Sequence, residues 1–243
     1  MARAAVPGRL IWRVATVDAT KDETATARTL VLDVPGWPGH LAGQHVDVKL
    51  TAEDGYSVER SYSIASAADG TRLELTVQRI ADGEVSPYLT DDLQPGDKLE
   101  LRGPVGGWFV WDPSSTAPVL LVAGGSGVVP LMAMIRANTN KVRVRLIYSV
   151  RSPADILYGP ELSERARVSP LTLTYLYTRS APAGMPVGRI NADTVAAAGW
   201  PPDSKPAVFV CGPTGFVEAA ANLLVAAGHD PAAVKTERFG PTG

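Results

Sequence analysis

The spacing of turn residues changes near the middle of this 243-residue chain, and that change limits the folds it can adopt. Before Gly103-Pro104, short β-rich runs are separated by turn pairs such as Asp54-Gly55 and Asp69-Gly70. Short strands separated by frequent turns are typical of a small antiparallel β-barrel or sandwich. The expected strands cover residues 9–17, 26–34, 45–50, 59–64 and 72–77.

The second half has a different pattern, in which apolar runs alternate with helix-like stretches. A polar connector at residues 113–116 separates the halves, so we expect one domain over residues 1–112 and another over residues 117–243. Strands that alternate with helices predict a doubly wound parallel sheet, whose ligands bind at the carboxyl ends of the strands. The expected strands are residues 119–123, 142–149, 171–178 and 207–211, and the expected helices are residues 130–137, 159–166, 192–198 and 216–227.

Charge and cysteine content argue against several partners and cofactors. A formal net charge of −2 gives no general attraction to nucleic acid or to an anionic membrane, so neither is expected as a partner. The single cysteine, Cys211, cannot supply the thiolates of an iron–sulfur cluster or a disulfide framework. Residues 1–7 lack the apolar core of a secretory signal, and the three histidines show no metal-binding spacing. We therefore expect a cytoplasmic protein without a bound metal.

The tetrapeptide Arg60-Ser61-Tyr62-Ser63 lies on one of the expected strands and has the residue types that can hold a flavin. Alternate residues of a strand face the same way, so the Tyr62 ring faces one side of the strand. The long side chain of Arg60 can reach a diphosphate. Ser63 can place a hydroxyl or a backbone amide beside a ring nitrogen. Four residues of this kind also recur by chance, so their weight depends on the motifs that follow.

A second motif, Gly83-Glu84-Val85-Ser86, precedes Pro87 and opens an expected helix through Leu93. Ser86 and Pro87 suit the N-cap and first turn of a helix, which leaves backbone amides free for an anion. Arg79 lies just upstream. The alternative is a capped helix that binds nothing.

The third motif, Gly124 to Pro130, follows the first strand of the second half and opens a helix. Glycines let the backbone approach a diphosphate, and the helix N-terminus supplies oriented N–H groups. The run is not the G-x-G-x-x-G fingerprint, and a glycine-rich turn without a ligand is the alternative.

The fourth motif, Cys211-Gly212-Pro213, follows the last expected strand and lies at the same edge of the sheet as the glycine loop. A small, polarizable thiol could sit against a nicotinamide without crowding it. The alternative is a buried, inert cysteine.

These four motifs, in this order, resemble those of the ferredoxin–NADP reductase family over about residues 9–239. The resemblance implies a flavin-binding β-barrel followed by an α/β domain that binds a pyridine nucleotide. It implies Ser63 and Cys211 as catalytic residues, beside the reactive flavin nitrogen and the nicotinamide. The flavin contacts that it implies are Arg60, Ser61, Tyr62, Ser63, Val77, Gln78, Arg79, Gly83, Glu84, Val85 and Ser86. The chain departs from the family in having no terminal tyrosine to cover the flavin, and we expect Phe239 to cover it in part.

The resemblance also implies where a nicotinamide nucleotide binds. Its diphosphate would lie on Gly124, Gly125, Ser126, Gly127, Val128 and Pro130, and its nicotinamide would lie at Cys211, Gly212 and Pro213. The family often has hydroxyl residues where this chain has Val128 and Val129, so these phosphate contacts are expected to come from the backbone.

Arg151 and Arg179 each follow a strand and could pair with a 2′-phosphate, which favours NADPH over NADH. Asp155 lies close to Arg151 and weakens that preference, and an ordinary surface role for both arginines is the alternative. The predicted function is a reductase that takes hydride from NAD(P)H onto FAD, with FMN less favoured, and passes electrons to a separate acceptor such as a ferredoxin or an oxygenase component. The alternatives are an electron-transfer subunit of a larger complex and a non-enzymatic dinucleotide-binding module.

Overall fold

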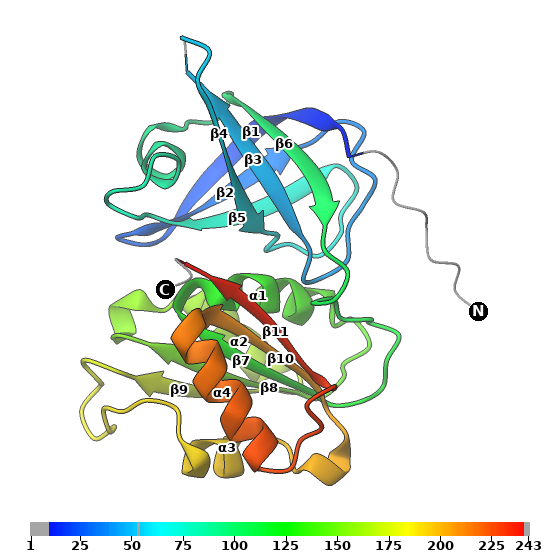
Figure 1. The fold of residues 1–243 in the computed structure, drawn as a ribbon, viewed down its shortest axis with the longest axis vertical. Coiled ribbons are helices and arrows are strands. Elements are labelled where there is room, and N and C mark those ends of the chain that lie inside the picture. The colour runs from blue at the N-terminus through cyan, green and yellow to red at the C-terminus, as the bar shows by residue number, and fades with distance from the viewer. Residues whose placement is uncertain (1–9, 53, 241–243) are drawn as a thin grey trace.

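The computed structural model describes residues 10–52 and 54–240, which form two β-sheets, one above the other in Figure 1. Arg9, the first residue of the expected strand 9–17, and the segment 1–7 lie outside the described residues. Within the described part of the chain, no helix is long and apolar enough to cross a membrane. The same residues contain no group of His, Cys, Asp and Glu side chains arranged to hold a metal ion.

The first sheet is antiparallel and has six strands in the order β4-β3-β6-β1-β2-β5. A bridge between Ile64, just after β4, and Leu75 of β5 joins the two edges, so the sheet closes into a barrel as predicted. Alternate residues such as Leu30 and Leu32 point inward and are fully buried. The strands are β1 (Trp12–Thr24), β2 (Ala27–Asp33), β3 (His45–Thr51), β4 (Ser57–Ser63), β5 (Arg72–Gln78) and β6 (Lys98–Val105).

The second sheet is parallel throughout, with the strand order β11-β10-β7-β8-β9. Two separate apolar clusters cover its faces, one containing α1 and α2 and the other α3 and α4, which confirms the predicted doubly wound arrangement. The strands are β7 (Val119–Gly124), β8 (Val144–Val150), β9 (Leu171–Tyr177), β10 (Ala207–Pro213) and β11 (Val234–Phe239), and the helices are α1 (Val128–Ala137), α2 (Gly159–Val168), α3 (Ala192–Ala198) and α4 (Thr214–Ala226).

The segment between β6 and β7 packs on both sheets. The backbone N–H of Trp111 donates to the carbonyl of Ala42 in the barrel half, at 3.1 Å. The Phe109 ring meets Phe209 of β10 edge to face, with 5.4 Å between ring centroids. Both connector side chains belong to the apolar cluster of the α/β half. Because this segment packs on both halves, its contacts do not mark a domain boundary. The predicted domains, residues 1–112 and 117–243, remain predictions.

Candidate functional site

A cleft of about 1230 Å³ lies where the barrel meets the carboxyl ends of the parallel strands. This is the edge at which sheets of this kind bind ligands. All four motifs contribute at least one residue to its lining. The barrel wall of the cleft contains residues 60–63, 78–80 and 82–86 with Thr26 and Thr76, and the α/β wall contains residues 124–126, 149–151 and 239–240 with Val129, Asp155, Thr178, Pro213 and Phe216.

Exposed charged side chains characterise the barrel wall. Arg60 extends from β4, and its Nη2 lies 3.4 Å from Oε2 of Glu84. Arg79, just after β5, pairs with Asp91 at 2.7 Å. Both arginines are partly exposed beside the cleft. They can therefore exchange a carboxylate partner for the phosphates of a ligand.

Tyr62 and Ser61 lie on opposite faces of β4, as strand alternation requires. Tyr62 packs against the apolar core of the barrel, and burial raises the pKa of its phenol to about 12, so the ring stays neutral. The Ser61 hydroxyl donates to Oδ1 of Asp47 at 2.7 Å. Both residues line the cleft, but the hydroxyl of Ser61 already has a partner within the barrel.

The turn Gly83-Glu84-Val85-Ser86 reaches the cleft, but Ser86 does not cap a helix. Its Oγ accepts a hydrogen bond from the backbone N–H of Ile80 at 3.0 Å, and the segment that follows is a π-helical turn at Tyr88–Asp92 without a side-chain cap. The expected N-cap was wrong, because the hydroxyl closes the turn behind it. Val85 is nearly fully buried, so Gly83 and Glu84 present the more open part of the turn.

Val77 and Phe239 occupy different positions relative to the cleft. Val77 is wholly buried in the barrel core, so only its neighbours Gln78 and Arg79 line the cleft. Gln78 donates to the backbone and the hydroxyl of Thr26, which fixes its amide at the cleft edge. Phe239, the last residue of β11, lines the cleft with 37% of its surface exposed.

Close packing, more than charge, shapes the glycine loop of the α/β wall. A Cβ on Gly127 would lie 2.1 Å from the carbonyl oxygen of Cys211, and one on Gly124 would lie 2.6 Å from the ring of Phe216. Gly124, Gly125 and Ser126 line the cleft. Val128 and Pro130 are buried behind it in α1, so the structure does not bring their side chains to a ligand.

Cys211 does not reach the cleft. Its side chain is 1% exposed and packs in an apolar core cluster, where burial raises the pKa of its thiol well above the ordinary value. Gly212 is also buried, and of this motif only Pro213 lines the cleft. The thiol is therefore neutral and enclosed, and its predicted place beside a nicotinamide remains a prediction.

Arg151 lines the cleft at the end of β8, whereas Arg179 is exposed outside its lining. The two residues are adjacent, because the N–H of Arg179 donates to the Arg151 carbonyl at 2.9 Å. Asp155 also lines the cleft and accepts a hydrogen bond from the Ser152 hydroxyl at 2.6 Å. The structure thus places Asp155 and one of the two arginines in the cleft.

The sequence reasoning missed Glu237 of β11. The Ser63 hydroxyl donates to its Oε1 at 3.2 Å, so this contact joins β4 of the barrel to the α/β half. Burial raises the pKa of Glu237 to about 7, and the Ser63 hydrogen bond opposes that rise. Phe216 and Thr76 were missed as well. A strand prediction for residues 234–239 would have placed Glu237 at the same sheet edge as Cys211, its register partner.

The cleft, with a flavin-type barrel motif on one wall and a strand-end glycine loop on the other, defines a two-domain oxidoreductase that binds a flavin and a dinucleotide. Residues 14–110 match the oxidoreductase FAD-binding domain, and residues 121–222 match the oxidoreductase NAD-binding domain. The chain is 38% identical over 181 residues to ferredoxin–NADP reductase B of Sorangium cellulosum, covering 70% of this chain and 73% of that protein. The chain belongs to the ferredoxin–NADP reductase-like family of FAD- and NAD-binding oxidoreductases.

Two further similarities describe the extent of the match. The glycine betaine monooxygenase reductase subunit of Chromohalobacter salexigens is 34% identical over 209 residues, which cover 82% of this chain but 56% of that protein. The chain thus spans little more than half the length of that curated relative. The FAD/NAD-binding domain of nitric oxide dioxygenase from Vibrio cholerae superposes with a TM-score of 0.85 at 25% identity, covering 94% of this chain and 99% of that domain.

Proposed function

We propose that this chain is an NAD(P)H-dependent flavoprotein reductase that carries FAD and passes electrons to a separate acceptor. The single observation that carries the proposal is the cleft of about 1230 Å³, which collects the flavin motif and the glycine loop from two different domains. A site for one small ligand is commonly about 300–1,000 Å³, so this cleft has room for more than one ring system. The family match to an FAD-binding domain favours FAD over FMN.

The residues present fit both cofactors. Arg60 and Arg79 supply charge for a diphosphate, the Tyr62 ring supplies an aromatic surface, and the turn at Gly83 lines the cleft. On the other wall, Gly125 has open space where a side chain would be. When bound, the flavin would accept hydride from the nicotinamide nucleotide and release electrons to the acceptor.

Ser63 and Glu237 would act at the junction of the two walls. The Ser63 hydroxyl donates to Glu237 and lies on the same strand as Arg60 and Tyr62. A carboxyl with a pKa of about 7 can hold or release a proton near neutral pH. The Glu237 carboxyl would therefore hold a proton within one hydrogen bond of the Ser63 hydroxyl, which lies on the flavin side. Cys211 would contribute by shaping the wall behind the nicotinamide.

Anaerobic titration of the purified protein with NADH and with NADPH tests the proposal. Bleaching of a flavin spectrum by either nucleotide supports it. Mass spectrometry of the released flavin decides between FAD and FMN. A protein that stays colourless, and neither binds added flavin nor oxidises NAD(P)H, overturns it and favours a non-enzymatic dinucleotide-binding module.

For nucleotide choice we propose NADPH, because Arg151 lines the cleft beside the exposed Arg179. A guanidinium at the end of a parallel strand can pair with a 2′-phosphate. Asp155 in the same lining would disfavour that phosphate. Comparing the two nucleotides in the titration decides the question directly.

The acceptor is proposed to be a ferredoxin or the oxygenase component of a multicomponent system. The relatives named as a monooxygenase reductase subunit and a ferredoxin–NADP reductase support this range. The same names support the second candidate, an electron-transfer subunit active only within a complex. Reduction of an artificial dye by the isolated chain favours an independent reductase, whereas activity that requires a co-expressed neighbour favours the subunit.

A further inference from the structure

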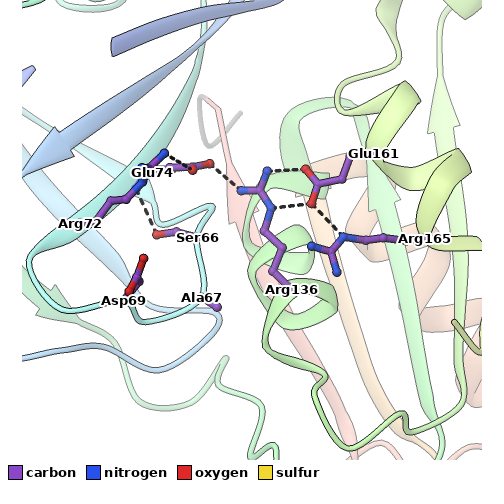
Figure 2. A pocket seen from close by; sticks show the side chains of 8 residues that line it. All are labelled: Ser66, Ala67, Asp69, Arg72, Glu74, Arg136, Glu161 and Arg165. Carbon is purple, nitrogen blue, oxygen red and sulfur yellow. Dashed lines mark hydrogen bonds and ion pairs between the residues drawn. The ribbon is translucent and has the colours of Figure 1, made fainter. Parts of the chain in front are cut away.

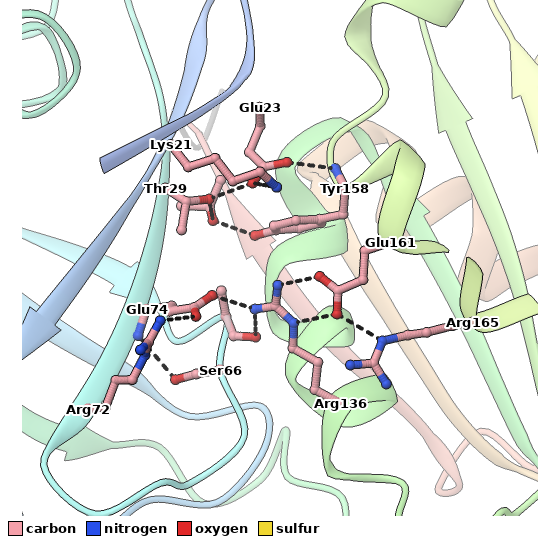
Figure 3. Close-up of polar contacts among 12 residues, drawn as sticks. Lys21, Glu23, Thr29, Ser66, Arg72, Glu74, Arg136, Tyr158, Glu161 and Arg165 are labelled. Atoms are coloured by element: carbon pink, nitrogen blue, oxygen red, sulfur yellow. Dashed lines mark hydrogen bonds and ion pairs between the residues drawn. The ribbon is translucent and has the colours of Figure 1, made fainter. Parts of the chain in front are cut away.

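A group of polar side chains crosses from the barrel to the α/β half (Figure 3). One member of the group, Thr76, lines the cleft. We call this group the seam cluster. It consists of Glu74 and Thr76 of β5, Glu23 of β1, Arg136 of α1, and Tyr158 and Glu161 at the start of α2. The proposed hydride transfer does not use any of these residues directly.

Arg136 forms the first connection across the seam. Its Nη1 donates to Oε2 of Glu74 at 2.8 Å and to the carbonyl of Ala65 at 3.0 Å, both in the barrel half. Its Nε and Nη2 donate to the two oxygens of Glu161 in its own half, at 3.0 and 2.6 Å. Figure 2 shows the guanidinium between the two carboxylates. A cation with 14% of its side chain exposed needs such partners, so separating the halves would leave it incompletely paired.

Tyr158 forms the second connection. Its side chain is fully buried, its hydroxyl donates to Oγ1 of Thr76, and its N–H donates to Oε2 of Glu23 at 3.2 Å. The guanidinium of Arg136 lies 5.3 Å from the centre of its ring. Tyr158 has a φ of 57°, a conformation uncommon for a residue other than glycine. The contacts on its N–H, ring and hydroxyl stabilise that conformation.

The two connections join the elements that carry the proposed cofactor contacts. Helix α1 begins directly after the glycine loop and carries Arg136 near its other end. Strand β5 carries Glu74 and Thr76 and ends at Gln78, which lines the cleft. Thr76 lines the cleft itself. A helix and a strand transmit position over their length, so the contacts of the seam cluster link the position of the glycine loop to that of β5 in the barrel wall.

We infer that the seam cluster positions the two cofactor-binding walls for hydride transfer, with Arg136 and Tyr158 as positioning residues; this presumes the reductase activity proposed above. Hydride transfer requires the reacting atoms at near-contact distance, and a displacement of about 1 Å can lower its rate about a hundredfold. Loosening the seam should therefore slow transfer at saturating nucleotide more than it weakens binding of either cofactor.

The experiment uses the full chain with Glu74→Ala and, separately, Tyr158→Phe. Each change removes one cross-seam contact and leaves the Arg136–Glu161 pair in place. Glu164→Ala is the matched control, because Glu164 lies on the same helix as Glu161 and pairs with Arg167 of the same helix at 2.7 Å, with no ion pair to the barrel among residues 10–52 and 54–240. Spin labels at Lys98→Cys and Val168→Cys, one on each half and both exposed, report the distance across the seam. Cys211 is too buried to compete for label.

We expect Glu74→Ala to broaden the label-to-label distance distribution. At saturating nucleotide it should slow flavin reduction about tenfold, with nucleotide and flavin affinities changed less than about threefold. Tyr158→Phe should act in the same direction but less strongly. Distances and rates equal to those of Glu164→Ala overturn the inference. If Glu74→Ala does not fold, Tyr158→Phe decides by the same two measurements. Failure of the unsubstituted protein to reduce its flavin would instead overturn the proposed function, and the distance measurement would still test the seam.

Discussion

The two walls of the cleft are built in different ways, although the sequence assigned a diphosphate to each. On the barrel wall, Arg60 and Glu84 are more than half exposed and pair across 3.4 Å. On the α/β wall, the glycine loop packs against β10, and the residues behind it are buried. One wall thus presents charged side chains, whereas the other presents backbone held by close packing.

This difference shows that the two motifs need glycine for different physical reasons. Around Gly83, the nearest atoms to an added Cβ are the Ser86 hydroxyl at 3.1 Å and the Ile80 carbonyl at 3.2 Å, so these atoms need to shift by only a few tenths of an ångström. Around Gly127, the nearest atoms belong to the backbone of Cys211 and Gly212, which cannot move without displacing β10. We therefore expect charge substitutions to alter the barrel wall and glycine substitutions to alter the α/β wall.

The largest effect should come from Gly127→Ala. An added Cβ 2.1 Å from the Cys211 oxygen forces the loop away from β10, and we expect a loss of about 3 kcal/mol or more in unfolding free energy. Gly83→Ala should cost about 1 kcal/mol at most. Gly215→Ala is the control, since its Cβ would meet nothing within 4 Å. Urea unfolding measures all three, and similar values for Gly83→Ala and Gly127→Ala would contradict the comparison.

Arg60→Ala tests the charged wall, where we expect a loss of flavin affinity instead of a loss of stability. Removing a charge-assisted contact to a phosphate should weaken flavin binding by about 2 kcal/mol, or about 30-fold in Kd, with little loss of stability because Arg60 is exposed. Arg28→Ala is the matched control, because Arg28 pairs with Asp22 in the same barrel outside the cleft lining. Fluorescence titration of the apoprotein with FAD measures both variants. Equal affinities would show that the barrel wall also relies on its backbone.

Glu237 tests the junction of the two walls through pH. Its pKa rises from 4.5 to about 7 on folding, so between these values the folded protein holds a proton that the unfolded chain has lost. Its stabilising contribution is therefore complete below pH about 4.5 and is lost as the pH rises through about 7. Relative to Glu237→Gln, the unsubstituted protein should lose about 3 kcal/mol between pH about 4.5 and about 8, because the pKa differs by about 2.5 units between the folded and unfolded states.

Chemical denaturation without added flavin, repeated across that pH range, gives the difference between the two proteins. Glu218→Gln provides the control. Glu218 lies in α4 and forms an exposed ion pair with Arg238, the residue that follows Glu237 in β11. A difference that stays flat with pH, or that grows in the opposite direction, would show that Glu237 does not carry a raised pKa.

The sequence predicted both sheets because each has a strong local pattern. Alternation in β5 and buried runs such as β7 are set by neighbouring residues. The two missed strands, β6 and β11, are interrupted by charged residues. Strand β6 pairs with β1 and β3, which lie far away in the chain, and β11 pairs with β10, the strand before it. Pairing of either kind is not visible in the local pattern of residues, so neither strand was recognised.

For the site, the sequence located the motifs but did not show which of their side chains point into the cleft and which point into the core. It assigned Arg60, Tyr62 and Gly124 to cofactor binding, and the structure has all three in the lining of the cleft. It could not show that the Cys211 thiol turns into the core, because a strand's two faces are indistinguishable when both are apolar. Glu237 was missed for a related reason: its contact with Ser63 spans 174 residues.

Arg151 is the residue most able to break the comparison, because it and Asp155 are charged side chains on the wall whose glycine loop relies on backbone and packing. If it pairs with a 2′-phosphate, Arg151→Ala should weaken NADPH binding about fivefold, or about 1 kcal/mol, and change NADH binding less than about twofold. Arg143→Ala is the control, since Arg143 stacks on Trp200, 4.8 Å from the ring centre, and is not part of the cleft lining. Binding titrations with both nucleotides separate the outcomes. Equal weakening for NADH and NADPH would show that Arg151 contacts a part that the two nucleotides share. No weakening for either nucleotide would show that the α/β wall binds through its backbone without Arg151.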